Sequence, residues 1–269
     1  DIVGERRLVN ALSLDVISNT AGKIAGPLLG GVLLDTVDFS GAYVVVLAVH
    51  TLNLGMVARL RIPLQQTSRL DVSVLRSLGE AIGYAVRSPM LVGLLYVTIL
   101  MNALAFPVQQ FIPAIGRDHL GVGATLVGLL VAAEGFGQLG GAGLMSITRR
   151  VRFHGRVFVA GSVAVLALTL IFVWSPWYTL AFVIRAIGGI GQSGFSTMQS
   201  TITMLAAPQG MRGRMMGLLS FCIGVGTPLG ALEIGALAAV FSIRGAISAN
   251  AIAGLLLIVP ALVFTSLIT

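Results

Sequence analysis

The sequence predicts an all-α, polytopic membrane protein. Three observations support this fold class: the composition, the long apolar stretches and the positions of the arginines. Of 269 residues, 56% are hydrophobic and only 10% are charged, and the mean hydropathy is +0.97. A soluble domain of this length could not cover its surface with so few polar side chains. The chain is therefore expected to lie mostly within a lipid bilayer.

Eight apolar stretches are long enough to span a membrane as a helix, which takes roughly 20 residues. A backbone in lipid must satisfy its own hydrogen bonds, and segments of this length do so as α-helices. The spans are expected at residues 8–35, 41–60, 90–115, 121–148, 157–175, 177–206, 214–240 and 246–268. Pro107 and Pro113 lie in the third span, where they can open the helical backbone.

The arginines gather in alternate loops, before the first span and after the second, fourth and sixth, whereas the intervening loops hold only Arg117 and Arg244. Arginine-rich loops remain in the cytoplasm. This rule places both ends of the chain in the cytoplasm and the protein in the plasma (inner) membrane. The net charge of +7 reflects this pattern rather than one basic surface, so nucleic acid is not an expected partner.

The first span contains a stripe of small residues, because Gly22, Gly26 and Gly30 recur at every fourth position. Such a stripe lies on one face of a helix and allows another helix to approach closely. Pro27 removes one helical hydrogen bond inside the stripe, and Gly31 follows it. We therefore expect this segment to pack tightly against another helix.

The spacing Gly22-x3-Gly26-Pro27-x2-Gly30-Gly31 resembles the fifth-helix signature of proton-coupled drug exporters in the major facilitator superfamily. The seventh span contains a related pattern, residues 224–230, as expected for a fold built from two parallel repeats. Residues 208–217, 111–113 and 123–128 look most like the exporter subgroup that includes enterobactin and macrolide efflux proteins. This resemblance implies a secondary active transporter that exports its substrate, with Gly22, Gly26, Pro27, Gly30 and Gly31 as a conformational motif.

If the first span corresponds to helix 5, the resemblance implies that the chain holds helices 5 to 12 and lacks the first four helices of the fold. Residues 1–62 would then end the amino-terminal bundle, 63–89 would be a cytoplasmic linker, and 90–269 would form the carboxy-terminal six-helix bundle. The chain begins at Asp1, inside what reads as a cytoplasmic loop, so we expect a fragment of a longer protein. In the linker, Leu75, Leu78, Ile82 and Ala85 predict an amphipathic helix. It is interpreted either as a packed linker or as a regulatory or lipid-sensing element.

Ionisable side chains near the middle of a span are rare and costly, and they usually mark functional sites. Lys23 lies near the middle of the first span and Glu134 near the middle of the fourth. The resemblance places these two spans against each other, so the residues either form a pair or have separate roles, with Glu134 facing a wet cavity. Asp15, in the cytoplasmic third of the first span, is a further coupling candidate with a structural role as its alternative. Protons are the expected coupling ion.

The sixth span carries the longest polar stripe of the chain. Its members lie on one helical face and are Arg185, Gln192, Ser196, Gln199 and Thr203. We expect the stripe either to line a substrate cavity or to join helices by hydrogen bonds. Asn102, Phe106 and Gln109 of the third span are expected to line the cavity from the opposite side. Glu233 of the seventh span is expected at the depth of Arg185 and is its predicted partner.

These patterns predict an exporter that moves a small amphipathic molecule, such as a drug or a siderophore, by alternating access. A membrane protein that does not transport, either a sensor or an inactive truncated remnant, is the alternative. The sequence contains no nucleophile elbow, phosphate-binding loop or zinc-protease motif, so an enzyme is not expected. His50, His119 and His154 lack metal-ligand spacing and Cys222 is alone, so neither a metal nor a cofactor is expected. The full-length protein is expected to be a monomer.

Overall fold

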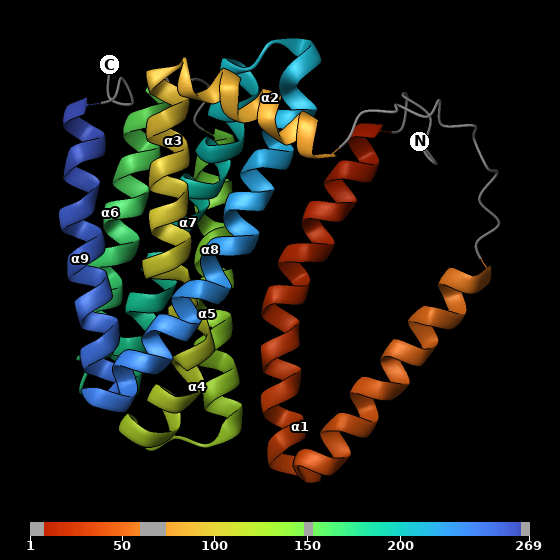
Figure 1. The fold of residues 1–269 in the computed structure, drawn as a ribbon. Helices are drawn as coiled ribbons and strands as arrows, with labels where there is room; N and C mark the ends of the chain where they lie inside the picture. Colours follow the sequence, from red (N-terminus) through yellow and green to blue (C-terminus); the bar gives the residue numbers. More distant parts are fainter. Residues whose placement is uncertain (1–7, 60–73, 148–152, 265–269) are drawn as a thin grey trace.

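A computed structural model describes residues 8–59, 74–147 and 153–264, with side chains over 18–59, 75–147 and 153–263. Long helices that run side by side make up most of these ranges (Figure 1). Six helical stretches within them are long and apolar enough to cross a membrane: Ser18–Arg59, Pro89–His119, Ala124–Ile147, His154–Val173, Gln209–Val240 and Ile243–Val263. The chain is an all-α, multi-pass membrane protein, as its composition predicts.

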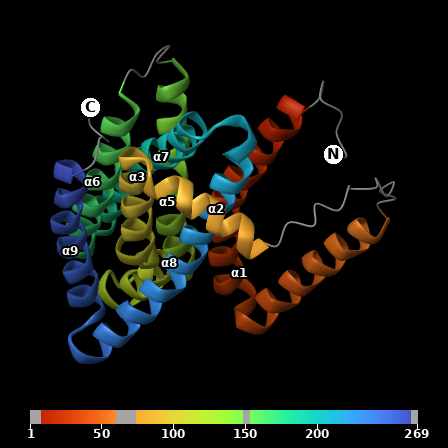
Figure 2. The same ribbon diagram turned by 45° about the horizontal axis from the view of Figure 1, so that its top comes forward.

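Helix α1 (Leu8–Arg59) contains the first two predicted spans, joined by a sharp bend at Asp38. The backbone of Asp38 has φ 60° and ψ 178°. A positive φ is unusual for a residue with a side chain, and aspartate is among the residues that tolerate it best. The arm before the bend packs on helix α5, whereas the arm after it leaves the bundle at an angle (Figures 1 and 2).

The third predicted span is helical but irregular. In chain order it consists of α3 (Pro89–Leu100), the π-helix η2 (Met101–Ala105), the 3₁₀-helix η3 (Phe106–Phe111), a short α4 (Ile112–Ala114) and the π-helix η4 (Ile115–His119). Pro107 and Pro113 cause part of this irregularity, because neither can donate a helical hydrogen bond. The prediction that these prolines open the backbone is confirmed, and such irregular turns often occur at functional sites.

The remaining predicted spans are regular helices, with ends within a few residues of the predicted ones. They are α5 (Ala124–Ile147), α6 (His154–Val173), α7 (Tyr178–Ala206), α8 (Arg212–Val240) and α9 (Ile243–Phe264), and a 3₁₀ turn, η5 (Gln209–Met211), precedes α8. Helix α7 is not among the six most apolar stretches, because Arg185 and Gln192 lower the hydropathy of its first half.

Helix α2 (Val74–Val86) is the predicted amphipathic helix of the linker and lies across the end of the bundle (Figure 1). Its buried face overlaps the predicted one only in part. Ala85 is buried and Leu78 packs beside it, as predicted, whereas Leu75 and Ile82 are 80% and 45% exposed and Ala81 is buried instead. Glu80 fixes the helix by ion pairs with Arg76 on the same helix and with Arg214 at the start of α8. The packed-linker interpretation therefore fits the structure.

The described residues form three buried apolar clusters: two within the bundle and a third where α2 packs on α3 and α8. Aromatic rings order the first cluster, in which Phe195 of α7 stacks on Phe158 of α6 with ring centroids 4.9 Å apart. Phe106 of η3 meets the edge of Phe195 at 5.4 Å. These contacts fix the irregular third span against α7 next to its polar residues.

Candidate functional site

An ion pair between α5 and α7 is the centre of the candidate site. Arg185 Nη2 donates to Glu134 Oε2 at 2.5 Å, and the two side chains are 7% and 13% exposed. The Arg185 guanidinium also lies over the ring of Phe172, 5.6 Å from its centroid. Each charge compensates the other, which offsets the large cost of removing both from water.

Glycines explain why these two side chains meet. A Cβ atom at Gly137 of α5 would collide with the carbonyl oxygen of Ala186, and one at Gly189 of α7 would collide with the carbonyl oxygen of Glu134. The backbones of α5 and α7 therefore cross in direct contact, within about one helical turn of both charged residues. Neither helix could approach so closely with a side chain at these positions.

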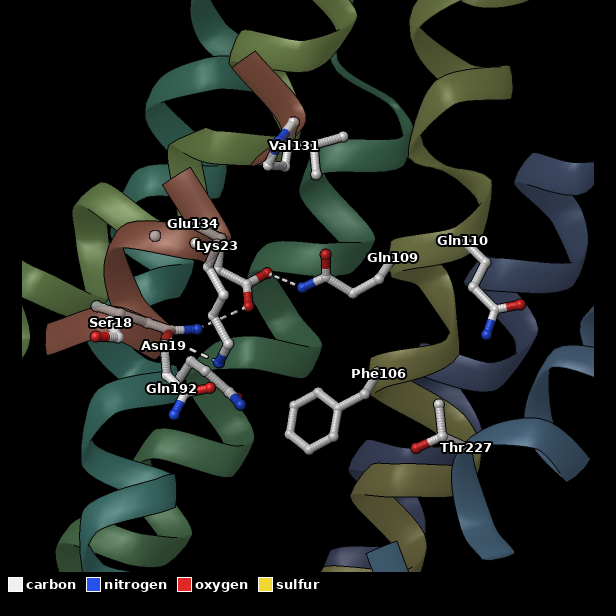
Figure 3. A pocket seen from close by; sticks show the side chains of 14 residues that line it. Ser18, Asn19, Lys23, Phe106, Gln109, Gln110, Val131, Glu134, Gln192 and Thr227 are labelled. Carbon is white, nitrogen blue, oxygen red and sulfur yellow. Dashed lines mark hydrogen bonds between the residues drawn. The ribbon is translucent and has the colours of Figure 1, made fainter. Parts of the chain in front are cut away.

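Two side-chain amides complete the surroundings of the Glu134 carboxylate. Gln109 Nε2 of η3 donates to Oε2 at 2.5 Å, and Gln138 Nε2, one turn along α5, donates to Oε1 at 3.1 Å. Figure 3 shows Gln109 reaching across from the third-span helix to Glu134. With Arg185, the carboxylate has three donors from three different helical segments.

The predicted partner of Arg185 is wrong. Glu233 lies exposed on α8, and the arginine pairs with Glu134 instead. Counting residues from the outer end of a span gives the depth of a side chain but not the neighbour toward which its helix face turns. The pair of glycines one turn from each charged residue was the sequence signal that could have identified the contact.

Lys23 lies beside this site without pairing with the carboxylate. Its Nζ atom donates to Gln138 Oε1 at 3.4 Å, and within the described side chains no carboxylate oxygen lies within 4 Å of it. The structure therefore does not contain the direct ion pair of Lys23 and Glu134, and it favours separate roles for the two residues. Gln138 connects the two residues, because its amide group donates to one and accepts from the other.

A cavity of about 960 Å³ opens beside Lys23 and Glu134. Its polar lining consists of Ser18, Asn19, Lys23, Gln109, Gln110, Glu134, Gln138, Gln192 and Thr227, and Phe106 contributes an aromatic ring (Figure 3). The lining comes from α1, η3, α5, α7 and α8, so the cavity lies between the first arm of α1 and the rest of the bundle. Its volume is that of a site for a small organic molecule.

The polar stripe of α7 serves both of the predicted purposes. Gln192 lines the cavity, and its buried Oε1 atom has no hydrogen-bond partner. Gln199 instead donates to Thr98 Oγ1 at 2.8 Å and joins α7 to α3. Thr203 is buried, and Ser196 is exposed and donates to the carbonyl oxygen of Ser193 within its own helix.

Among the cavity residues predicted from the third span, Phe106 and Gln109 are placed in the lining, but Asn102 is not. Asn102 is buried in η2, where its side chain donates to Thr98 O at 2.8 Å and accepts from Thr227 Oγ1 at 3.2 Å. It therefore joins the third span to α8 behind the cavity wall. Thr227 itself reaches the cavity, and the sequence reasoning did not single it out.

The glycine motif of α1 contacts α5 through a different face from the predicted one. A Cβ atom at Gly22, Gly26 or Gly30 would meet no atom within 4 Å, so this stripe does not face α5. The close contact runs through Gly31, where a Cβ would lie 2.5 Å from Ala124 O, and through Pro27, whose carbonyl oxygen lies against Gly128. Gly22 and Pro27 also line the cavity.

Next to this contact, the carboxylate of Asp35 joins the first arm of α1 to the start of α5. Asp35 accepts hydrogen bonds from the backbone N–H groups of Ala124 at 3.2 Å and Thr125 at 2.8 Å. The first N–H groups of a helix lack partners inside the helix, and a carboxylate is favoured there by the helix dipole. The sequence reasoning missed Asp35. The side chain of Asp15, the remaining coupling candidate, lies outside the described residues.

Comparisons with known proteins agree with this architecture. Residues 111–268 match the family model described as Major Facilitator Superfamily. The enterobactin exporter EntS of Salmonella choleraesuis is 26% identical over 246 residues, and that of Escherichia coli O1:K1 is 28% identical over 260 residues. These matches cover 90% and 96% of this chain but 58% and 61% of the relatives, so the chain spans about three fifths of their length. The chain belongs to the Major Facilitator Superfamily.

Proposed function

We propose that the protein is a secondary active exporter of the plasma membrane, which moves a small amphipathic molecule by alternating access and is driven by proton entry. The ion pair of Glu134 and Arg185 beside a cavity of about 960 Å³ carries this proposal. Membership of a transporter family supports it, and the curated relatives named as enterobactin exporters favour the outward direction.

In this proposal the chain supplies helices 5 to 12 of a longer transporter that works as a monomer. Residues 1–62 belong to the amino-terminal bundle, 63–89 to the cytoplasmic linker and 90–269 to the carboxy-terminal bundle. The arginine-rich loops lie in the cytoplasm, as the positive-inside rule predicts. The close backbone contacts of α1 with α5 then lie toward the outer side, and the cavity residues Ser18, Asn19 and Lys23 lie toward the cytoplasm.

Glu134 is the proposed proton carrier. A proton on Glu134 would cancel the carboxylate charge, so Arg185 would lose its ion-pair partner, and Gln109 and Gln138 would lose a charged acceptor. These three groups come from η3, α5 and α7. Protonation would therefore change how three helical segments are held together, which is the link between proton binding and movement that coupled transport requires.

The test is Glu134→Gln in the full-length protein. Glutamine keeps the size of the side chain and cannot bind the coupling proton. We expect uphill export of a dye in membrane vesicles with an imposed pH gradient to be lost, while passive exchange of the same dye across the vesicle membrane remains. Glu233→Gln is the matched control, because Glu233 is exposed on α8 and belongs to no ion pair among the described residues.

The two variants separate coupling from a general loss of acidic charge. Wild-type uphill export by Glu134→Gln, with unchanged pH dependence, would show that Glu134 does not carry the proton. Loss of export in Glu233→Gln alone would indicate that Glu233, and not Glu134, carries the proton. Asp15→Asn tests the remaining candidate in the same assay.

A further inference from the structure

Lys23 presents to the cavity an ammonium group that has no ion-pair partner among the described side chains. An ammonium has three N–H donors, and the one hydrogen bond of Lys23 Nζ in the structure is the 3.4 Å contact with Gln138 Oε1. Glu134 is not its partner, because no ion pair within 4 Å joins them, and that carboxylate accepts from Arg185, Gln109 and Gln138 instead. Lys23 is also the one lysine among the 269 residues. A charge at this depth is costly unless it is compensated.

The charge balance of the described cavity is positive. Lys23 and Glu134 are its ionisable lining residues, and the charge of Glu134 is cancelled by Arg185. The other polar lining groups are neutral amides and hydroxyls, which can bind either sign of charge. The ammonium of Lys23 is therefore the group that distinguishes an anion from a cation here.

Two further lining residues, Gln192 and Phe106, indicate which other groups the ligand contains. Gln192 lines the same cavity as Lys23 (Figure 3), and its Oε1 atom is buried without a donor among the described residues. A buried acceptor of this kind is costly unless a ligand or water donates to it. Phe106 supplies an apolar surface on the opposite side. The cavity thus offers an ammonium, an unsatisfied acceptor and an aromatic ring.

We infer that Lys23 determines the charge selectivity of the transporter, and that its substrate is a small organic anion that also carries an O–H or N–H donor and an apolar part. This inference rests on the proposed function and assigns its substrate class. The ammonium binds the anionic group and Gln192 accepts from the donor. Lipophilic cations are rejected, because the same ammonium repels them.

The experiment compares three fluorescent probes of similar size on the full-length protein: carboxyfluorescein as the anion, its neutral ester and a rhodamine cation. Export from vesicles and equilibrium binding to the purified protein are both measured. The variants are Lys23→Gln, Lys23→Glu and Lys23→Arg. Arg87→Gln is the control, because it removes one positive charge from the exposed end of α2, away from the cavity.

We expect Lys23→Gln to weaken binding of the anionic probe by about tenfold, as for the loss of one hydrogen bond between charged groups, with little effect on the cation. Lys23→Glu should reverse the preference, and Lys23→Arg should keep it. A change in preference is a readout that a purely structural role of Lys23 would not produce. Arg87→Gln should bind and export like the wild type.

The outcomes separate this inference from the proposed function. If the wild type exports anion and cation equally and Lys23→Gln changes neither, export stands and the selectivity of Lys23 is refuted. If the anion binds in a Lys23-dependent way and no probe is exported, the selectivity stands and the export function is refuted. Failure of the wild type to bind any anionic probe also overturns the inference.

Discussion

Glu134 and Arg185 depend on each other energetically. Removing one member of a buried ion pair leaves an uncompensated charge and costs about 3–5 kcal/mol. The pair is 7% and 13% exposed, so little water can replace a lost partner. Single substitutions that leave either charge alone should therefore affect folding as well as transport, and Glu134→Gln is the milder choice because its amide can still accept from Arg185.

At the same scale, Gly137 controls how closely α5 approaches α7. We predict that Gly137→Ala destabilises the purified protein by about 1–3 kcal/mol, the usual cost of overpacking, because the new methyl group would collide with the Ala186 carbonyl oxygen. It should also reduce export, since moving the helices apart stretches the ion pair. Thermal unfolding and vesicle export measure the two effects.

Gly140→Ala is the matched control on the same helix. A Cβ atom at Gly140 meets nothing within 4 Å, so alanine there should be neutral or stabilising by about 0.5–1 kcal/mol because it lowers the entropy of the unfolded chain. Equal melting temperatures for Gly137→Ala and Gly140→Ala would contradict the role assigned to the crossing point.

At the scale of elements, periodicity and proline positions in the sequence predict where the helices lie and where they are irregular. They do not predict which faces of two helices meet. The eight spans and the irregular third span follow from apolar length and from Pro107 and Pro113, which are local properties. The buried face of α2, the partner of Arg185 and the face of the α1 glycine motif do not, because each depends on the rotation of one helix against another. The depth of a side chain along its helix can be counted from the sequence, whereas the rotation of the helix about its axis depends on how it packs against its neighbours.

Asp35 gives the end of the first arm of α1, next to the Asp38 bend, a specific role. We predict that Asp35→Ala loosens the contact between α1 and α5, because Ala124 and Thr125 lose the acceptor of their N–H groups. The reporter is Val131→Cys in a Cys222→Ser background. Val131 lines both the central cavity and the neighbouring outer hollow beside Asp35. An impermeant thiol reagent added from the outer side should label the Val131→Cys reporter faster when Asp35→Ala is also present than when Asp35 is intact.

Thr36→Ala is the control for this experiment. Thr36 follows Asp35, and its hydroxyl donates to Val32 O within α1 rather than to α5. Its substitution should leave the labelling rate of Val131→Cys at the wild-type value. An unchanged or slower rate in Asp35→Ala would show that the carboxylate does not hold the outer ends together.

At the scale of the whole molecule, contacts and charges divide the chain between two ends. The close contacts between α1 and α5 extend from Ile24 to Asp35, and the cavity lies on the amino-terminal side of this region. Glu80 and Arg214 join the linker helix to α8 at the opposite end of the bundle from the Asp38 bend (Figure 1). One end of the described bundle therefore carries the close α1–α5 contacts, and the other carries the ion pair that joins α2 to α8.

The orientation of these ends is the last prediction. Arginine-rich loops resist transfer across the membrane, so Gly210, before α8, should lie in the cytoplasm, and Ser40, next to the Asp38 bend, should lie outside. Both positions are exposed, and in a Cys222→Ser background each can carry a single cysteine. In intact cells an impermeant maleimide should label Ser40→Cys and not Gly210→Cys, and breaking the cells should make Gly210→Cys reactive, which controls for burial. Labelling of Gly210→Cys alone in intact cells would invert the topology, and with it the direction of proton entry on which the proposed export depends.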